Sequence, residues 1–226
     1  MAGSAFLRKN KNQHSIKNSL SKGMEVDIDA ALKEVIETLS KRHPKIKFRH
    51  FKKLDLSTIV ARLGQDFPQY KQDFSSVLNE SFMRPDGGFL YAISGQGEVK
   101  PVLVAEVKRQ GTNDKRELEG LPKQAKGNAI ERLGKNLIGI RAIFKQESVI
   151  PFVCFGSGHD FSPGSTILDR VVTMNEFFPL NTLFVKKDHP PFEPVSMYFR
   201  YKDWTTAEMV EIMLEIAETA IRSYSF

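Results

Sequence analysis

The chain has 226 residues, 41% of them hydrophobic, with one cysteine and a formal net charge of +6. This length suits one large domain or two small ones, and the hydrophobic share supports a packed core. A single cysteine excludes a disulfide framework and a cysteine-rich zinc site, no apolar run approaches the ~20 residues that span a bilayer, and the N-terminus lacks the pattern of a secretory signal. We therefore expect a cytosolic protein, and the positive charge indicates a polyanionic partner.

The N-terminal 23 residues are basic and polar. They contain no acid, and their cations are Arg8, Lys9, Lys11, Lys17 and Lys22. This composition predicts a flexible arm over residues 1–23, which either contacts phosphate groups or serves as a solubilising tail. Residues 24–226 show no repeat, no low-complexity linker and no domain boundary, so we expect one domain there.

Periodicity predicts the elements that follow. Apolar residues at three- and four-residue steps predict helices at 28–42, 55–65, 128–145 and 205–222. Apolar runs predict a hairpin over 87–108, a strand at 149–155, and short strands at 182–186 and 195–201. Residues 66–85 are ambiguous, and 109–126 form a long charged connection. This order predicts an α/β fold, a single domain with a central mixed β-sheet flanked by α-helices.

The hairpin carries a group of charged side chains that predicts metal-dependent chemistry. Glu106 and Lys108 stand two apart in Val-Leu-Val-Ala-Glu-Val-Lys at 102–108, so they point to the same face of a strand. Asp86 stands just before the apolar run 89–93, and a hairpin would bring it beside Glu106. Two converging carboxylates can hold a hard divalent cation, and an adjacent lysine can act on water or phosphate.

The same residues have a plainer interpretation. An Asp and a Glu-x-Lys occur by chance in many chains, and Glu106 and Lys108 could form a weak ion pair on a solvated strand face. The strand before them is apolar on both faces, however, so it is predicted to be central and buried. A charged pair at the end of a buried strand favours a function in phosphodiester hydrolysis.

A second motif stands at the start of the third predicted helix. Gly-Asn-Ala-Ile-Glu-Arg occupies 127–132, and a helix N-terminus presents free N–H groups and a positive dipole end. Asn128 can make two hydrogen bonds to adenine, and Ala129 can touch a thymine methyl. Alternatively, Asn128 caps the helix and Glu131 completes a capping box.

Basic residues surround this helix start. Between 123 and 145 there are six cations and one acid, Glu131; the cations are Lys123, Lys126, Arg132, Lys135, Arg141 and Lys145. Cations clustered on a helix are typical of surfaces that bind a nucleic acid backbone. We expect Lys123, Lys126 and Lys135 to contact DNA phosphates.

Taken together, these motifs carry a specific resemblance. Pro-Asp-Gly-Gly at 85–88, the Glu-x-Lys strand at 102–108 and Gly-Asn-Ala-Ile-Glu-Arg at 127–132 make the chain similar to the EcoRI-type (type II) restriction endonucleases of the PD-(D/E)xK nuclease superfamily. The likeness extends over nearly the whole chain beyond the arm. The catalytic motif is shared by many nucleases, whereas the helix-start motif is far more specific to this family.

The resemblance implies a role for each catalytic residue. Asp86 and Glu106 would bind Mg²⁺ with help from a backbone carbonyl near Val107. Lys108 would orient or activate the attacking water and stabilise charge in the transition state. The reaction would be sequence-specific cleavage of double-stranded DNA, leaving a 5′-phosphate and a four-base 5′ overhang.

It also implies partners. A homodimer would read a palindrome containing AATT, and a cognate adenine methyltransferase would protect the DNA of a bacterial host, in whose cytoplasm the enzyme would act. The residues that would contact bases are Gly127, Asn128, Ala129, Glu131, Arg132 and Arg170.

One position departs from the family pattern. Members of the family use two arginines three residues apart to read the outer base pair, and here Ile167 replaces the first while Arg170 keeps the second. An isoleucine cannot make a two-bond contact with guanine. We therefore expect the outer bases to be read differently or not at all.

Two other functions fit parts of the sequence. A DNA-binding protein without catalysis would not require Asp86, Glu106 and Lys108 together. A structure-specific or repair nuclease of the same superfamily would not require the motif at 127–132. The five histidines show no spacing typical of a metal site or of a histidine-based nuclease, so we assign them to surface or core positions.

Overall fold

The computed structural model describes residues 3–66, 68–70, 81–111, 118–122, 128–144, 147–158, 161 and 196–226; of these, the side chains of 3–21, 62, 63, 66, 70, 128–132, 135, 138 and 142 are not described. The elements follow the order α1 (Gly3–Arg42), β1 (Lys47–Phe51), β2 (Leu54–Asp55), α2 (Leu56–Asp66), η1 (Pro68–Tyr70), β3 (Phe82–Met83), β4 (Gly88–Ile93), β5 (Val99–Arg109), α4 (Asn128–Ile143), β6 (Phe152–Ser157), β7 (Ser196–Arg200) and α6 (Thr206–Tyr224).

A five-stranded mixed sheet forms the centre, in the order β1-β4-β5-β6-β7. The pairs β1–β4 and β4–β5 are antiparallel, whereas β5–β6 and β6–β7 are parallel. The central strand β5 is buried along most of its length, as expected for a strand covered on both faces. The predicted α/β fold with a mixed sheet flanked by helices is confirmed.

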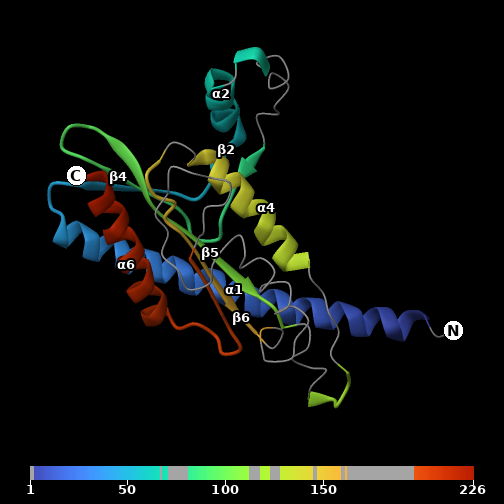
Figure 1. Cartoon of the computed structure of the whole chain (residues 1–226). Helices are drawn as coiled ribbons and strands as arrows, with labels where there is room; N and C mark the ends of the chain where they lie inside the picture. Colours follow the sequence, from blue (N-terminus) through green and yellow to red (C-terminus); the bar gives the residue numbers. More distant parts are fainter. Residues whose placement is uncertain are drawn as a thin grey trace.

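Alternation along β5 divides the core into two layers. Leu103, Ala105 and Val107 pack in one cluster with buried side chains of α1 and α6. Val104 belongs to the opposite cluster, in which Leu137 and the other buried residues of α4 pack on the sheet. The helices therefore cover both faces of the sheet, and Figure 1 shows α2 projecting from one end of this body. Because side chains alternate, Glu106 and Lys108 lie on the α4 face.

Helix α1 is much longer than predicted. It begins at Gly3 instead of residue 28 and ends, as predicted, at Arg42, and its first half extends beyond the sheet (Figure 1). The apolar stripe that predicts a helix begins only where α1 packs on the core, at Met24 and Ile28. The arm of residues 1–23 has no such stripe, so periodicity could not reveal its helix. Its mobility and its contact with DNA remain predictions.

Most other elements agree with the sequence. The predicted helix at 55–65 is α2, the hairpin is β4–β5, and 195–201 contains β7; α4 ends at Ile143, two residues early, and β6 starts at Phe152, three residues late. The short strands β1, β2 and β3 were not predicted, and 182–186 lies outside the described residues.

Cys154 is free and fully buried, as predicted. In the described parts, no helix is long and apolar enough to cross a membrane.

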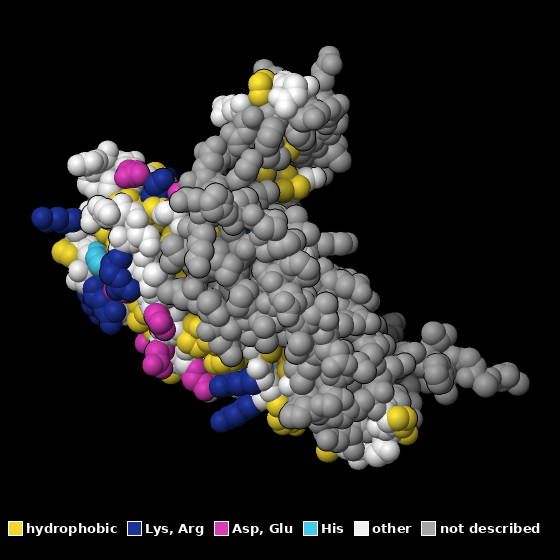
Figure 2. All heavy atoms as spheres, in the orientation of Figure 1, with side chains coloured by type: hydrophobic (Ala, Val, Ile, Leu, Met, Phe, Trp, Pro, Cys, Tyr) yellow, Lys and Arg dark blue, Asp and Glu magenta, His cyan; other side chains and the backbone are white. Residues whose placement is uncertain are grey.

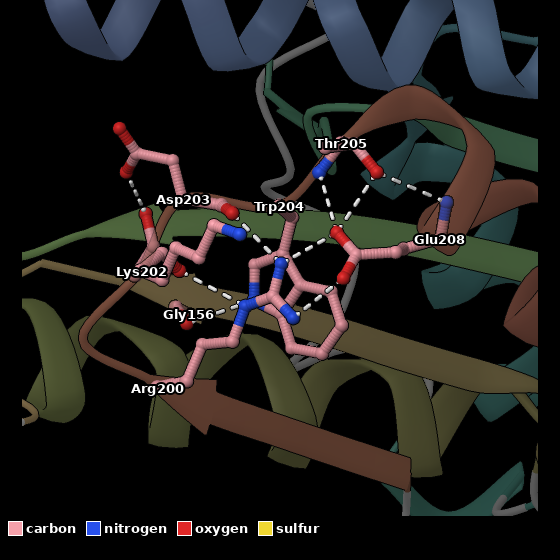
Figure 3. Close-up of polar contacts among 8 residues, drawn as sticks. Gly156, Arg200, Lys202, Asp203, Trp204, Thr205 and Glu208 are labelled. Atoms are coloured by element: carbon pink, nitrogen blue, oxygen red, sulfur yellow. Dashed lines mark hydrogen bonds and ion pairs between the residues drawn. The ribbon is translucent and has the colours of Figure 1, made fainter.

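The corner between β7 and α6 is held by Arg200 (Figure 3). Its guanidinium lies 3.7 Å from the ring centroid of Trp204 and donates to both carboxylate oxygens of Glu208, at 2.8 and 2.6 Å. Glu208 also completes the predicted capping box with Thr205. Trp204 in turn donates from its indole nitrogen to the carbonyl of Gly156 in β6, 3.0 Å away. A stacked, two-bond arginine–carboxylate pair thus joins the last strand to the last helix.

Replacing Glu208 should make stability depend less on pH. The hydrogen bonds from Arg200 and from the Thr205 backbone hold the pKa of Glu208 well below its usual range. A carboxyl group with a lowered folded-state pKa contributes stability above its unfolded pKa of about 4.3 and loses it as the pH falls toward the folded value. Glu208→Gln should therefore lower Tm at neutral pH, and its deficit against the wild type should shrink below about pH 4.

The measurement is thermal unfolding at a series of pH values, with Glu211→Gln on the exposed face of α6 as the control. A deficit that stays constant from pH 7 to pH 3 would contradict the role given to the Glu208 carboxylate.

Candidate catalytic site

The predicted catalytic side chains meet near the carboxyl end of β5. Glu106 and Lys108 share the α4 face of that strand and form an ion pair. Glu106 is 2% exposed, and the side chains of Lys108 and Asp86 are 18% and 25% exposed. The group is thus partly shielded from water, and Asp86 and Lys108 are its more accessible members.

Asp86 reaches this point because the turn before β4 is tightly fixed. The N–H of Gly87 donates to the carbonyl of Ala105 at 2.9 Å, which extends the β4–β5 ladder by one residue. Gly88 has φ +77°, and a Cβ there would collide with the Phe51 carbonyl of β1. Glycine is therefore required at 88, both for its backbone conformation and for the close approach of a neighbouring strand.

The two carboxylates and their backbone brace one another. The N–H of Asp86 donates to Oε2 of Glu106 at 3.0 Å, and the N–H of Val107 donates to Oδ2 of Asp86 at 3.2 Å. Nζ of Lys108 donates to Asp86 Oδ2 at 3.3 Å, to the Val107 carbonyl at 3.1 Å and to Oε1 of Glu106. One ammonium thus contacts three oxygens, each from a different residue.

Burial and charge act in opposite directions here. Burial raises the pKa of Glu106 above its ordinary value, while the Lys108 ammonium opposes the rise and Asp86 adds to it. Burial alone would lower the pKa of Lys108, but the carboxylates of Glu106 and Asp86 outweigh it and hold that pKa above its ordinary value. Lys108 therefore carries its charge at neutral pH.

Two residues of the site were not assigned a role from the sequence. His50 of β1 lies with Nε2 2.8 Å from the carbonyl of Gly87 and so supports the turn that carries Asp86. Asn136 of α4 donates from Nδ2 to Oε1 of Glu106 at 3.0 Å. Neither contact has a sequence signal, because each depends on which strand or helix packs beside the hairpin.

The donors fit a hard divalent cation. Carboxylate and carbonyl oxygens are the ligands that Mg²⁺ prefers, and the three oxygens around Nζ of Lys108 belong to Asp86, Glu106 and Val107, the set predicted to bind the metal. These oxygens stabilise the positive charge of the Lys108 ammonium, and the same oxygens could stabilise a bound cation. Within the described residues no group of three or more His, Cys, Asp and Glu side chains could hold a metal, so two carboxylates would need water or backbone oxygens as further ligands.

Comparison with known proteins identifies the family. The family model described as "Restriction endonuclease EcoRI" matches residues 10–225, which is nearly the whole chain. The chain belongs to the EcoRI family of restriction endonucleases. It is 26% identical to the type II restriction enzyme RsrI of Cereibacter sphaeroides, over 83% of this chain and 80% of that one. It is 27% identical to the type II restriction enzyme EcoRI of Escherichia coli, over 89% of this chain and 86% of that one.

Family membership makes this protein a type II restriction enzyme, a site-specific deoxyribonuclease. Of the residues predicted to face DNA, Asn128 is the first residue of α4, where the predicted helix also begins. The side chains of Asn128, Ala129, Glu131, Arg132 and Lys135 are not described, so the capping role of Asn128 stays untested. Gly127, Lys123, Lys126, Ile167 and Arg170 lie outside the described residues.

The face shown in Figure 2 carries no separate basic patch among its described side chains. On the face shown in Figure 2, the lysine, arginine, aspartate and glutamate side chains that the structure describes are intermixed. The side chains of the cations predicted to face DNA, between residues 123 and 135, are not described. Their contact with DNA therefore stays a prediction.

Proposed function

We propose that this restriction enzyme cleaves both strands of DNA at a palindrome containing AATT, depends on Mg²⁺, and leaves a 5′-phosphate with a four-base 5′ overhang. The observation that carries the catalytic part is the convergence of Asp86, Glu106 and the Val107 carbonyl on one ammonium, that of Lys108. The proposed sequence specificity rests on the Gly-Asn-Ala-Ile-Glu-Arg motif at the start of α4.

In this proposal the carboxylates hold the cation and the lysine acts on the water and the phosphate. Asp86, Glu106 and the carbonyl of Val107 hold the cation, and the backbone bonds between the two carboxylate residues keep their oxygens in place. When bound, Mg²⁺ supplies Lewis acidity toward a phosphate oxygen and lowers the pKa of a water molecule. The Lys108 ammonium, charged at neutral pH, orients the attacking water and stabilises the charge that develops on the phosphate. The water oxygen bonds to phosphorus, and the bond from phosphorus to the 3′ oxygen of the upstream nucleotide breaks, so that the phosphate stays on the 5′ side.

Base reading is proposed for the first turn of α4. Asn128 would accept from N6 and donate to N7 of adenine, and Ala129 would contact a thymine methyl. Glu131 and Arg132 would contact neighbouring base edges, with Gly127 allowing the close approach. Lys123, Lys126 and Lys135 would neutralise phosphates. Such contacts increase the affinity for DNA without a preference for sequence.

The outer base pair is proposed to differ from GAATTC. Ile167 stands where the family has its first arginine, while Arg170 keeps the second. Loss of a two-bond arginine–guanine contact removes about 1–3 kcal/mol of discrimination at that base. The target is therefore AATT alone, or AATT with relaxed or different flanking bases.

A palindromic target requires two copies of the site. A two-fold homodimer matches protein symmetry to site symmetry, so that each protomer cuts one strand. The basic arm of residues 1–23 would contact the DNA backbone. The enzyme would work in the bacterial cytoplasm, next to an adenine methyltransferase that protects the host DNA.

The catalytic assignment is tested by replacing one carboxylate. Glu106→Gln keeps the side-chain shape but removes the charge that would bind the cation, so plasmid cleavage in Mg²⁺ should fall by at least about 10²-fold, the usual scale for a lost group of this kind. Glu98→Gln is the matched control, because Glu98 is an exposed carboxylate in the turn of the same hairpin. Equal cleavage by the Glu106→Gln variant and the wild type would refute the assignment.

Methylation tests the recognition of adenine. A methyl group on N6 of the inner adenine removes or blocks the proton that Asn128 would accept, so fully methylated duplexes should resist cleavage. Duplexes of identical sequence, with and without the methyl group, provide the comparison. Equal rates on both would contradict the proposed partnership with an adenine methyltransferase.

A further inference from the structure

Among the described side chains of helix α4, that of Asn136 contacts the catalytic group. Nδ2 of Asn136 donates to Oε1 of Glu106 at 3.0 Å, across the interface between α4 and β5. Glu106 is 2% exposed, so water has little access to that oxygen. A hydrogen bond to a buried carboxylate fixes its orientation more firmly than one on the surface, because few competing donors are present.

The donors around Glu106 are not equivalent. Oε2 receives the backbone N–H of Asp86, which is set by the hairpin. Oε1 receives Lys108 and Asn136. A cation bound by these oxygens would repel the Lys108 ammonium, and Asn136 would then be the neutral side chain still holding Oε1 among the contacts described. Because the amide is uncharged, a bound cation would not repel it, and it could keep its hydrogen bond to Glu106.

The helix behind Asn136 is well anchored. Leu133 and Leu137, on either side of it, are fully buried against the sheet. One turn further on, Gly139 lies so close to Met83 of β3 that a Cβ would collide with the methionine side chain. The amide of Asn136 is therefore presented to Glu106 by a helix that packs on the sheet through Leu133 and Leu137 and lies against Met83 at Gly139.

We propose that Asn136 is a positioning residue that holds Glu106 in the orientation required to bind the divalent cation. This inference rests on the proposed role of Glu106 as a metal ligand. Because α4 also carries Asn128 in its first turn, about 12 Å away along the axis at ~1.5 Å per residue, one rigid helix would serve both base reading and the cation site.

The test measures cation binding directly. Mn²⁺ prefers the same oxygen ligands as Mg²⁺ and is paramagnetic, so free and bound Mn²⁺ can be distinguished by electron paramagnetic resonance without any cleavage. Loss of a side chain that orients a metal ligand typically weakens metal affinity by about 10–100-fold. We expect that loss for Asn136→Ala, together with an equal rise in the Mg²⁺ concentration required for half-maximal cleavage.

Three further variants make the result specific. Asn136→Gln and Asn136→Met have side chains of equal length and differ in the amide, so Gln should retain Mn²⁺ affinity and Met should lose it; this pair decides the question even where Ala perturbs folding. Gly134→Ala is the control on the same helix, because among the described residues a Cβ there meets no neighbouring atom within 4 Å, and it should leave Mn²⁺ affinity unchanged. Tm in EDTA monitors folding.

Several results would overturn the proposal. Mn²⁺ affinity that is the same in the Gln and Met variants would show that the amide does not act on Glu106. A loss of DNA binding in EDTA with unchanged Mn²⁺ affinity would assign Asn136 to phosphate contact instead. Glu106→Gln, run in parallel, separates the two levels: if it also keeps wild-type Mn²⁺ affinity and cleavage, the proposed metal site itself is wrong.

Discussion

Replacing Lys108 by methionine should abolish cleavage while leaving metal-free binding of specific DNA largely intact. Methionine keeps the unbranched stem but removes the ammonium that contacts Asp86, Glu106 and the Val107 carbonyl. Loss of one preorganised group that stabilises transition-state charge costs about 10²–10³-fold in rate, and loss of water orientation adds to it. Single-turnover cleavage of a duplex in Mg²⁺ measures this effect.

The same variant separates catalysis from cation binding. Lys108 and a cation compete for the same oxygens, so Lys108→Met should still bind Mn²⁺ and should still gain stability when Mg²⁺ is added. Lys100→Met is a suitable control, because Lys100 lies on the same strand and pairs with Glu147 and Glu98 away from the site. Persistent Mg²⁺-dependent cutting by Lys108→Met would refute the role of the ammonium.

Replacing Asn128 by alanine should remove about 1–3 kcal/mol of discrimination at adenine. Asparagine can make two hydrogen bonds to the edge of that base, and alanine can make none. Competition between duplexes that differ at one base pair, in EDTA so that no DNA is cut, measures the preference directly. The loss should be confined to the adenine position.

Lys135→Ala provides the contrast for that measurement. A residue that contacts phosphate contributes equally to every sequence, so its loss should weaken all duplexes alike and reduce the salt dependence of binding. If Asn128→Ala behaved in the same way, with an unchanged order of preference, the first turn of α4 would not read bases.

Much of the fold could be predicted because its strands and helices have strong local signals. The buried run 102–108 and its antiparallel neighbour gave the hairpin, and with it the proximity of Asp86 to Glu106. The stripe of Leu133, Leu137, Ile140 and Phe144 correctly located the buried face of α4. Thr205 and Glu208 marked the start of α6 through a capping box that the structure contains.

Other features depend on packing and could not be predicted from local patterns. Strand β1 alternates exposed and half-buried residues and lies at the sheet edge, so its sequence pattern is weak. The contact of His50 with the turn that carries Asp86 could not be predicted for the same reason. The Asn136–Glu106 bond requires knowing which face of β5 lies under α4. The first half of α1 has no apolar stripe, since it extends beyond the core.

The most direct test of the account is sequencing of the DNA ends produced by digestion of genomic DNA in Mg²⁺. Every fragment should carry a four-base 5′ overhang of AATT with a 5′-phosphate, and the flanking bases should depart from a uniform G on one side and C on the other. Ends without a shared AATT, or no cleavage by the wild-type protein, would contradict the proposed function. Uniform GAATTC sites would contradict the role given to Ile167 and leave the catalytic assignment standing.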